Sequence, residues 1–349
     1  MFAFEDHITH QKNSPSPGHL PAPGYLLLET TTECNLKCKH CHQWMTTEGP
    51  GALSTSEKIR AIEEFADLNP NGRILLTGGE TMHKYEEFMA ICRRARELNL
   101  DVIANTNGTY INPENMREVL EFGPRFLLFS LDSHIEKLHR FMRGNALNYQ
   151  HLVSIIPQMV AMRNSESFDT FLYTHTILFE ENLELWEDYI SFARQSLHVD
   201  SVHFQLLKET LRNQGDKDPF FDKHFFKNPQ RAWDIIETIK TKYAEDPIMG
   251  MRSYDLELMQ MEVFNPQHIE LGICNSANKN IYIDSYGQIQ LCMNMHEIMP
   301  SDAIGHYSKW DLASVWHSMQ AADAREIMKS CTKNCGMLNC HRKASHDRA

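Results

Sequence analysis

The chain has 349 residues, of which 42% are apolar and 10% aromatic, with 34 basic and 46 acidic side chains and a formal net charge of −12. This composition predicts a soluble globular protein of one to three domains and excludes a disordered chain. The acidic balance and the absence of a long apolar run argue against nucleic acid and membranes as partners. Residues 1–24 lack the basic start and apolar middle of a signal peptide, so we expect a cytoplasmic protein with reduced thiols.

Short apolar strands alternate with helical segments after the polar, Pro-rich residues 1–24. The expected strands are 25–29, 73–77, 101–105, 126–131, 170–177 and 201–206, and the expected helices are about 54–66, 84–98, 113–121, 149–162 and 183–196. Strands that alternate with helices in this way predict a parallel sheet, closed or partly closed into a barrel. The working residues of such a barrel lie on the loops after the strands.

The alternation ends after the sixth strand. Residues 208–222 are polar and loop-like, and helices are expected at 230–243 and about 255–263. A small hairpin is expected from strands 281–284 and 289–292, and one more helix at about 312–328. We therefore predict four parts, which are a lead-in (1–24), a barrel (25–207), a helical linker (208–270) and a small C-terminal domain (271–349).

Eight of the nine cysteines form two groups at opposite ends of the chain. Cys34, Cys38 and Cys41 share the loop after the first predicted strand, whereas Cys92 stands alone on the apolar face of a predicted helix and is expected in the core. The C-terminal group consists of Cys274, Cys292, Cys331, Cys335 and Cys340. In a reducing compartment, grouped cysteines of this kind indicate metal binding.

The spacing Cys34-x3-Cys38-x2-Cys41 allows three thiolates from one loop to converge on a single inorganic centre. A structural zinc ion requires a fourth ligand, which His40 or His42 would supply, so a zinc site remains the alternative. Thiolates also suit iron–sulfur clusters, in which an iron without a protein ligand is free to bind a substrate.

The cysteine loop and several later segments resemble the radical S-adenosylmethionine (SAM) superfamily. Residues 34–41 are similar to the loop in which three cysteines bind three irons of a 4Fe-4S cluster. The segment Gly78-Gly79-Glu80, after the second strand, resembles the motif that contacts the SAM amino group, although Thr81 stands where the family usually has proline. Taken alone, a glycine pair is more often an ordinary turn.

Segments after the third and fourth strands resemble parts of the same SAM site. Residues 105–108 and 130–132 are similar to segments that line it, and residues 139–144 resemble a stretch whose arginine, here Arg143, pairs with the SAM carboxylate. The SAM contacts implied by the resemblance are Gly78, Gly79, Glu80, Asn107, Ser130, Asp132 and Arg143. For the last three, the structural alternatives are a turn cap at Ser130 or Asp132 and a surface ion pair at Arg143.

The C-terminal cysteines carry a second resemblance. The pattern Cys274-x12-Gly287-x4-Cys292 is similar to the opening of the SPASM and Twitch extensions of this superfamily, which hold auxiliary 4Fe-4S clusters. The remaining Cys331-x3-Cys335-x4-Cys340 offers fewer cysteines than a two-cluster SPASM domain uses. The resemblance therefore implies one auxiliary cluster, held by the first two cysteines and two of the last three, and the spare cysteine is not readable from the sequence.

Together these resemblances imply an α/β fold, namely a partial (β/α)6 TIM-like barrel followed by a small α+β Twitch- or SPASM-like domain. They also imply an enzyme that cleaves SAM reductively to a 5′-deoxyadenosyl radical, which abstracts hydrogen from a substrate, with electrons from a flavodoxin- or ferredoxin-type partner. The auxiliary cluster would accept an electron or anchor the substrate. Neither the oligomeric state nor the redox balance of the reaction follows from the sequence.

We favour a sugar or aminocyclitol as the substrate, undergoing dehydrogenation, epimerisation or elimination, because about 24 residues before the barrel are too few for a leader-peptide-binding domain. Modification of a ribosomal peptide or protein side chain is the second hypothesis. A non-catalytic electron-transfer or zinc-binding protein is the third, and the implied SAM contacts argue against it.

Polar side chains on the last two barrel strands are candidates to touch the substrate. His203 and Gln205 alternate with apolar residues and share one face of the sixth strand, and His175 with Tyr173 makes a weaker case on the fifth. A lone inward histidine is more often a satisfied core residue. Four phenylalanines at positions 220, 221, 225 and 226 could cover the active site or pack between the barrel and the C-terminal part, and packing is the favoured interpretation.

Overall fold

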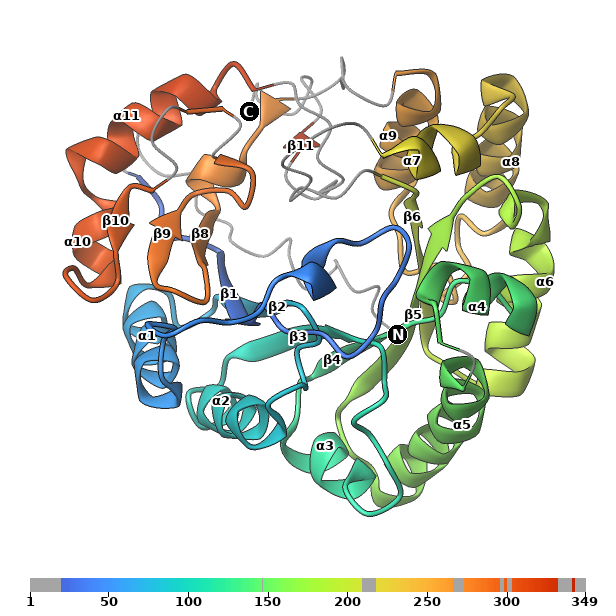
Figure 1. Cartoon of the computed structure of the whole chain (residues 1–349), viewed down its shortest axis with the longest axis horizontal. Coiled ribbons are helices and arrows are strands. Elements are labelled where there is room, and N and C mark those ends of the chain that lie inside the picture. Colours follow the sequence, from blue (N-terminus) through green and yellow to red (C-terminus); the bar gives the residue numbers. More distant parts are fainter. Residues whose placement is uncertain are drawn as a thin grey trace.

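The computed structural model describes residues 20–145, 147–208, 218–265, 273–295, 298–299, 303–331 and 341–342. Six parallel strands in chain order form the predicted partial barrel. These are β1 (Tyr25–Thr31), β2 (Arg73–Gly78), β3 (Asp101–Thr106), β4 (Phe126–Ser130), β5 (Phe171–Leu178) and β6 (Ser201–Leu206). Figure 1 shows them curving as one sheet, with the helices along its outer side.

The outer helices bury their apolar stripes against the strands. They are α1 (Thr55–Leu68), α2 (Tyr85–Glu97), α3 (Met116–Phe122), α5 (Asn148–Glu166) and α6 (Trp186–Phe192). The predicted capping box starts α1, because Ser54 Oγ accepts from the Glu57 N–H at 3.3 Å and the Glu57 carboxylate accepts from the Ser54 N–H at 2.8 Å. Cys92 lies in this core with 0% exposure, as predicted.

Two parts of the barrel differ from the predicted elements. A short helix, α4 (Glu136–Arg143), follows β4 and was not predicted, because eight residues give a weak periodic signal. The expected helix at 183–196 is a 3₁₀ turn, η3 (Leu183–Leu185), then α6, then a π-helical turn, η4 (Ala193–Leu197). A 3₁₀ turn, η2 (Gln43–Met45), also follows the cysteine loop.

The inward face of the barrel changes character along the strands. Near the amino ends it is filled by apolar side chains, among them Phe126, Leu128 and Tyr173. Toward the carboxyl ends the inward positions are polar and accessible, with Asn105 exposed and Ser130 partly exposed. A polar, accessible end of this kind is where parallel barrels place their working residues.

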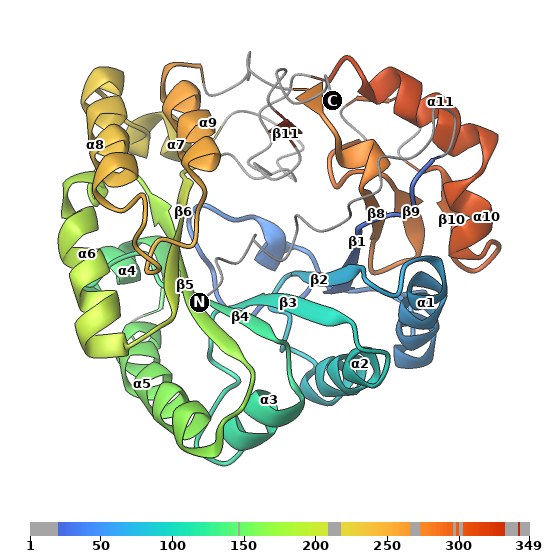
Figure 2. The same cartoon turned by 180° about the vertical axis from the view of Figure 1, so that it is seen from behind.

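The predicted C-terminal hairpin is present and continues the barrel sheet. Strands β8 (Asn280–Ile283) and β9 (Gln288–Gln290) pair antiparallel, and Gly287 adopts a φ of +90° in the turn between them. The sequence did not predict that β8 also pairs with β1, in parallel, or that β10 (Gly305–His306) adds to β9. The result is one nine-stranded sheet, in which β8 and β9 adjoin β1 when the molecule is seen from behind (Figure 2).

The remaining elements lie after β6. Three helices, α7 (Pro219–His224), α8 (Pro229–Lys242) and α9 (Ser253–Phe264), follow β6, and α7 lies partly within the segment expected to be a loop, of which 209–217 lie outside the described residues. The helix expected at 312–328 is two, α10 (Leu312–Trp316) and α11 (Met319–Met328), because Ser318 Oγ caps α11 by accepting from the Ala321 N–H at 3.1 Å. Strands β7 (Ile273–Cys274) and β11 (His341–Arg342) pair separately, and η5 (Ser276–Asn278) is a 3₁₀ turn.

The phenylalanines after β6 pack against apolar residues of the barrel and the main core. Phe221 lies with Met142 of α4 and Ile177 of β5 in a small apolar cluster, and Phe226 belongs to the main core. Within the described ranges, no helix combines the length and apolar character needed to span a bilayer.

Candidate active site at the carboxyl ends of the strands

The cysteine loop (residues 32–42) follows β1 and rests on the end of α4. Cys38 is buried, and Cys34 and Cys41 are half-buried. The Lys39 N–H donates to the carbonyl oxygen of Met142 at 2.9 Å. Gly144, at a φ of +71°, ends α4 so closely against the loop that a Cβ there would lie 2.7 Å from the Lys37 carbonyl oxygen. The sequence therefore needs glycine at this contact.

The environment of the thiols fits a site that binds a positively charged metal centre. Burial, reinforced by neighbouring thiolates, raises the pKa of Cys34 to about 11 and that of Cys38 to about 12, while the Arg143 charge opposes the rise. A metal centre removes such protons outright, because it neutralises the thiolates. His40 Nδ1, in the same loop, is buried without a hydrogen-bond partner among the described residues.

The zinc alternative has a different geometric requirement. A single ion holds its ligands close together, whereas a 4Fe-4S cluster spaces its cysteine sulfurs farther apart. In the part of the chain that the structure describes, no three His, Cys, Asp or Glu side chains are grouped tightly enough to hold a single metal ion.

Two glycines allow the end of β2 to touch the cysteine loop backbone to backbone. The Gly79 N–H donates to the Thr31 carbonyl oxygen at 2.8 Å, and the Glu80 N–H donates to the Glu33 carbonyl oxygen at 2.9 Å. A Cβ at Gly78 would lie 2.1 Å from the Thr31 oxygen, and one at Gly79 would lie 2.0 Å from the Glu33 oxygen. Any side chain here displaces the loop.

We expect Gly78→Ala to destabilise the protein far more than Gly51→Ala. Both residues have positive φ values, +125° and +96°, but a Cβ at Gly51 would meet nothing within 4 Å. The Gly51 variant should therefore lose only the stability that the backbone strain costs, about 1–2 kcal/mol. Urea unfolding of the two variants measures the difference, and equal losses would show that the contact with the Thr31 oxygen does not matter.

Glu80 joins the ends of β2 and β3. Its carboxylate accepts from Thr106 Oγ1 at 2.6 Å and from the Asn107 N–H at 2.7 Å, and the side chain is 2% exposed. Burial raises the pKa of Glu80. Thr81, in the position where proline was expected, donates from Oγ1 to the Asn105 carbonyl oxygen at 2.8 Å, so a side-chain hydrogen bond fixes this turn.

Asp132 and Arg143, both predicted SAM contacts, pair with each other in the structure. Arg143 Nε and Nη2 donate to the two Asp132 oxygens at 2.6 and 2.8 Å, and Asp132 is fully buried. Burial would raise the pKa of Asp132, but the Arg143 charge and hydrogen bonds outweigh it and lower that pKa to about 2. The same interactions raise the pKa of Arg143, whose guanidinium also hydrogen-bonds to Cys38.

A chain of hydrogen bonds connects this ion pair with Glu80. His139 Nδ1 accepts from the Asp132 N–H at 3.2 Å, so Nε2 carries the proton and donates to Asn148 Oδ1 at 2.8 Å. Asn148 Nδ2 donates to the Asn107 carbonyl oxygen at 2.8 Å. Burial lowers the pKa of His139 and keeps it neutral. His139 belongs to the motif at residues 139–144, but the sequence did not indicate its role. Asn148 was not predicted as a site residue, because no sequence pattern distinguishes it.

The substrate candidates His175 on β5 and His203 on β6 continue a row that begins with Ser130, an expected SAM contact, on β4. Ser130 pairs in register with His175, and His175 with His203, so the three lie side by side on the inward face. His175 also hydrogen-bonds to Gln205. Burial lowers the pKa of His175 to about 4 and that of His203 to about 3, so both imidazoles are neutral at pH 7.

The backbone of Gly250 supports the far end of this row. A Cβ at Gly250 would lie 2.2 Å from His203 Nε2, and the Tyr173 ring packs edge-on against His203 at 5.4 Å between centroids. Ring and backbone thus hold the imidazole in one orientation.

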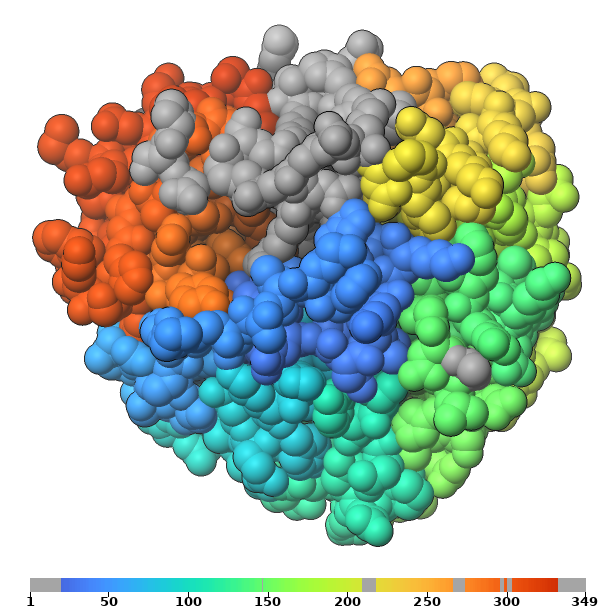
Figure 3. Space-filling view, viewed as in Figure 1, coloured from blue at the N-terminus to red at the C-terminus, as the bar shows by residue number. Residues whose placement is uncertain are grey.

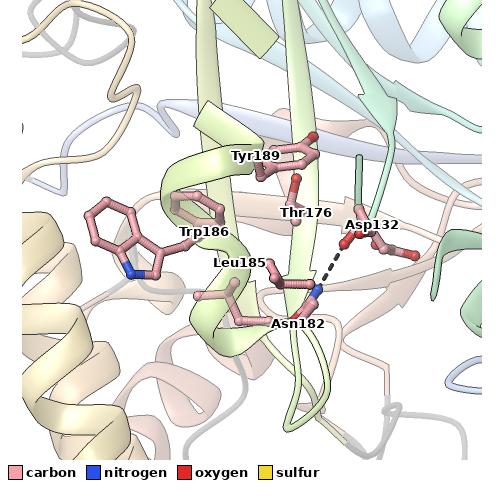
Figure 4. A pocket seen from close by; sticks show the side chains of 9 residues that line it. Asp132, Thr176, Asn182, Leu185, Trp186 and Tyr189 are labelled. Atoms are coloured by element: carbon pink, nitrogen blue, oxygen red, sulfur yellow. Dashed lines mark hydrogen bonds between the residues drawn. The ribbon is translucent and has the colours of Figure 1, made fainter. Parts of the chain in front are cut away.

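A small cavity lies on the other side of the sheet from this row. Asp132, Thr176, Trp186 and Tyr189 are among its lining residues, and Asn182 Nδ2 donates to the Asp132 carbonyl oxygen at 2.8 Å across it (Figure 4). It has room for about one water molecule. The cavity therefore supports the Asp132 backbone and is separate from the inward face.

The described C-terminal cysteines lie on segments that are tied together. Ser276 Oγ, beside Cys274, donates to the carbonyl oxygen of Leu291, which precedes Cys292, at 2.8 Å. Arg325 of α11, the helix that leads to Cys331, donates to the Ala277 carbonyl oxygen at 3.1 Å. Cys335 and Cys340 lie outside the described residues.

A buried contact that the sequence did not predict joins the cysteine loop to the C-terminal hairpin. The Gln43 N–H donates to Cys41 Sγ at 3.4 Å, and Gln43 Nε2 lies 3.5 Å from Glu29 Oε1. Glu29 Oε2 accepts from the N–H of Ser285, in the hairpin turn, at 3.0 Å. One buried carboxylate thus bridges the two parts of the sheet.

Comparison with known proteins gives a family match and several relatives. Residues 28–193 match the family model of the radical SAM superfamily. An AdoMet-dependent heme synthase of Oleidesulfovibrio alaskensis is 36% identical over 125 residues, covering 36% of this chain and 32% of the relative. This match and a second heme synthase match, from Methanosarcina barkeri, each span about a third of the relative's length.

Other similarities extend over nearly the whole chain. The antilisterial bacteriocin subtilosin biosynthesis protein AlbA of Bacillus subtilis is 21% identical over 336 residues, covering 93% of this chain and 67% of AlbA. Among solved structures, Streptococcus suis SuiB bound to S-adenosylmethionine has a TM-score of 0.64 at 16% identity, covering 91% of this chain and 73% of SuiB. AdoMet-bound anSMEcpe has a TM-score of 0.61 at 13% identity, covering 88% and 84%. These structures share the fold.

Proposed function

Because residues 28–193 match the family model of the radical SAM superfamily, we propose that this protein is an enzyme that cleaves SAM reductively to methionine and a 5′-deoxyadenosyl radical and removes a hydrogen atom from a substrate held in the barrel. The observation that carries the proposal is the cysteine loop of Cys34, Cys38 and Cys41, packed against Arg143 at the open end of the sheet. A 4Fe-4S cluster on these cysteines supplies the electron for the cleavage.

The residues around the loop would hold SAM. The proposed contacts are Gly78, Gly79, Glu80, Asn107, Ser130, Asp132 and Arg143. Glu80 accepts hydrogen bonds on both carboxylate oxygens and Arg143 donates from two nitrogens, so both side chains are fixed before SAM arrives. Such preorganisation reduces the entropy that binding must overcome and keeps the reactive carbon in one place.

For the substrate we propose a peptide side chain, the second of the sequence hypotheses. AlbA, a bacteriocin biosynthesis protein, matches 93% of this chain, whereas the heme synthase match covers 36% of it. A sugar or aminocyclitol remains the other candidate, because the neutral row of Ser130, His175 and His203 offers hydrogen bonds suited to hydroxyl groups.

We also propose an auxiliary 4Fe-4S cluster on Cys274, Cys292 and two of Cys331, Cys335 and Cys340. Hydrogen bonds that tie the segments of the described members support it. Such a cluster would accept an electron from the substrate or anchor it, and its position beyond the β8–β9 hairpin would set it apart from the cysteine loop.

The proposed chemistry has a direct test. Protein reconstituted anaerobically with iron and sulfide, then given dithionite and SAM, should form 5′-deoxyadenosine and contain about eight iron and eight sulfide per chain if both clusters are 4Fe-4S. Zinc without sulfide, or no 5′-deoxyadenosine, would exclude the radical SAM proposal. The substrate test gives the enzyme either a peptide encoded by a neighbouring gene or a sugar made by enzymes encoded nearby, and mass spectrometry measures any change in mass. A candidate substrate whose mass does not change is excluded.

We expect His203→Ala to uncouple SAM cleavage from conversion of the substrate. His203 lies on β6, two strands away from the proposed SAM contact Ser130 on β4, so 5′-deoxyadenosine should still form in the variant. The amount of product should fall at least about tenfold, because a misplaced substrate reacts more slowly. His198→Ala, on the loop before β6, is the matched control and should keep the ratio of product to 5′-deoxyadenosine. An unchanged ratio in His203→Ala would remove this residue from the substrate site.

A further inference from the structure

Four exposed cations lie on the cysteine loop and on α4, the helix against which the loop rests. Lys37 and Lys39 alternate with buried residues on either side of Cys38, and both are exposed. Lys137 and Arg140 are exposed on α4, three residues apart and therefore on one face of the helix. We call these four side chains the cationic patch.

The loop and the helix form one surface. The Lys39 N–H donates to the Met142 carbonyl oxygen at 2.9 Å, and Lys39 Nζ lies 4.1 Å from the ring centroid of Phe141, also on α4. In Figure 3 the loop (blue) and the segment of α4 (green) adjoin on the face toward the viewer. The cysteine loop and α4 therefore form one surface, and the cationic patch lies on these two segments.

These cations differ from most others on the molecule. Many exposed arginines and lysines of the barrel are in ion pairs, such as Arg93 with Glu118 and Arg94 with Glu63. No ion pair with another described residue is found for any member of the cationic patch. Glu136, the nearest acidic neighbour along α4, instead accepts a hydrogen bond from Gln150 at 3.4 Å. In a chain of net charge −12, unpaired cations gathered at one place indicate a binding surface for an anion.

Apolar side chains border the same surface. Met45, just after the loop, is 62% exposed, and Leu147, just after α4, is 70% exposed. Lys37 Nζ lies 5.4 Å from the ring centroid of Trp44, beside Met45. Exposed apolar groups among charges are typical of a protein interface, whereas a small anion would not need them.

The position of the patch connects it with the cluster. Arg143, at the end of α4, hydrogen-bonds to Cys38, and Lys37 and Lys39 flank that cysteine in the chain. An electron that enters from outside has to arrive near the cluster, because electron tunnelling weakens steeply with distance. Lys37 and Lys39 are the chain neighbours of Cys38, so a carrier docked on the cationic patch would lie close to that cysteine.

We propose that the cationic patch is the docking surface for a small acidic electron-transfer protein of the flavodoxin or ferredoxin type. This inference rests on the proposed function. For each SAM cleaved, the carrier would give one electron to the cluster and would itself be oxidised by one electron. Charge attraction orients the carrier, and Met45 and Leu147 contact its apolar surface.

The test reverses charge on α4 and leaves the cysteine loop untouched. Lys137→Glu combined with Arg140→Glu should lower the rate of 5′-deoxyadenosine formation with reduced flavodoxin or ferredoxin about tenfold at low ionic strength. The rate with dithionite, a small reductant that needs no docking, should stay within about twofold of the wild type. Added salt should slow the wild type with the protein carriers but not the variant.

The matched control carries the same change in net charge elsewhere. Lys309→Glu combined with Lys329→Glu alters two exposed side chains beside α10 and at the end of α11, on the opposite side of the molecule from α4 (Figure 1), and should keep both rates. Unchanged carrier-supported rates in the α4 variant, or equal losses with carrier and dithionite, overturn the proposal. The proposal is also overturned if the α4 variant no longer binds the peptide substrate but still cleaves SAM with the carrier at the wild-type rate. A wild type that is inactive with dithionite instead refutes the proposed function.

Discussion

We expect Cys38→Ala to abolish 5′-deoxyadenosine formation and to lower the iron content from about eight to about four per chain, because a cubane cluster that loses one of its three cysteine ligands is not retained. Cys38 is the most buried of the three and lies beside Arg143, and the other two thiols of the loop already serve as ligands in the proposed site. Iron and sulfide analysis and chromatography of the reaction products measure both effects.

Cys92→Ala is the matched control for this variant. Cys92 is fully buried in the core between α2 and the sheet, and burial alone raises the pKa of its thiol, which suits a structural role. The control should keep its iron and its activity and lose about 1 kcal/mol of stability. If Cys38→Ala kept its iron, or Cys92→Ala lost it, the assignment of the cysteine loop as the cluster site would be wrong.

The second large effect concerns the buried ion pair. Arg143→Met leaves the fully buried Asp132 carboxylate without its partner, and we expect the free energy of unfolding to fall by about 3–5 kcal/mol. The double variant Asp132→Asn with Arg143→Met should lose less than Arg143→Met alone, because no uncompensated charge remains in it. Urea unfolding of the cluster-free protein measures both without a contribution from iron.

An exposed pair provides the comparison. Arg94 lies between Glu63 and Glu97 on the surface, and Arg94→Met should change stability little, because solvent screens such pairs. If Arg143→Met and Arg94→Met had equal effects, the Asp132 pair would be unimportant to stability. A double variant that lost more than the single variant would also contradict the charge argument.

The same pair sets a dependence on pH. The pKa of the Asp132 carboxyl is about 2 in the folded protein, below the ordinary value of 3.8, so the unfolded chain binds this proton more readily. The stabilisation is therefore complete above about pH 4 and is lost as the pH falls toward 2, a difference of about 2 kcal/mol. Unfolding midpoints at pH 5 and pH 3 should differ more in the wild type than in Asp132→Asn, and equal differences would argue against the pair.

Local sequence patterns were sufficient for most of the barrel. All six strands lie where the alternation predicted them, and the capping box at Ser54 starts α1. The cysteine spacing and the Gly78-Gly79 pair pointed to the same end of the sheet, where the structure brings them together. These features depend on residues near each other in the chain, which is why periodicity and spacing predict them.

The contacts missed from the sequence are long-range. The hydrogen bond between Asn148 and Asn107 spans 41 positions, and the contact of Glu29 with Ser285 spans 256. An asparagine or a strand glutamate carries no sequence signal that identifies so distant a partner. The pairing of Asp132 with Arg143 was missed for another reason. Each residue was assigned to SAM by resemblance, while α4, which brings them together, is too short to predict.

The parallel pairing of β1 with β8 affects how the protein can be divided. A chain cut before residue 271, at the proposed start of the C-terminal domain, loses the strand that covers β1. It would expose the apolar part of β1 that β8 covers, residues 25–28, as a free edge that recruits strands from other molecules. Fragments ending there should self-associate, and the cysteine loop that β1 carries would lose its support, so the barrel and the hairpin form one cooperative unit of folding.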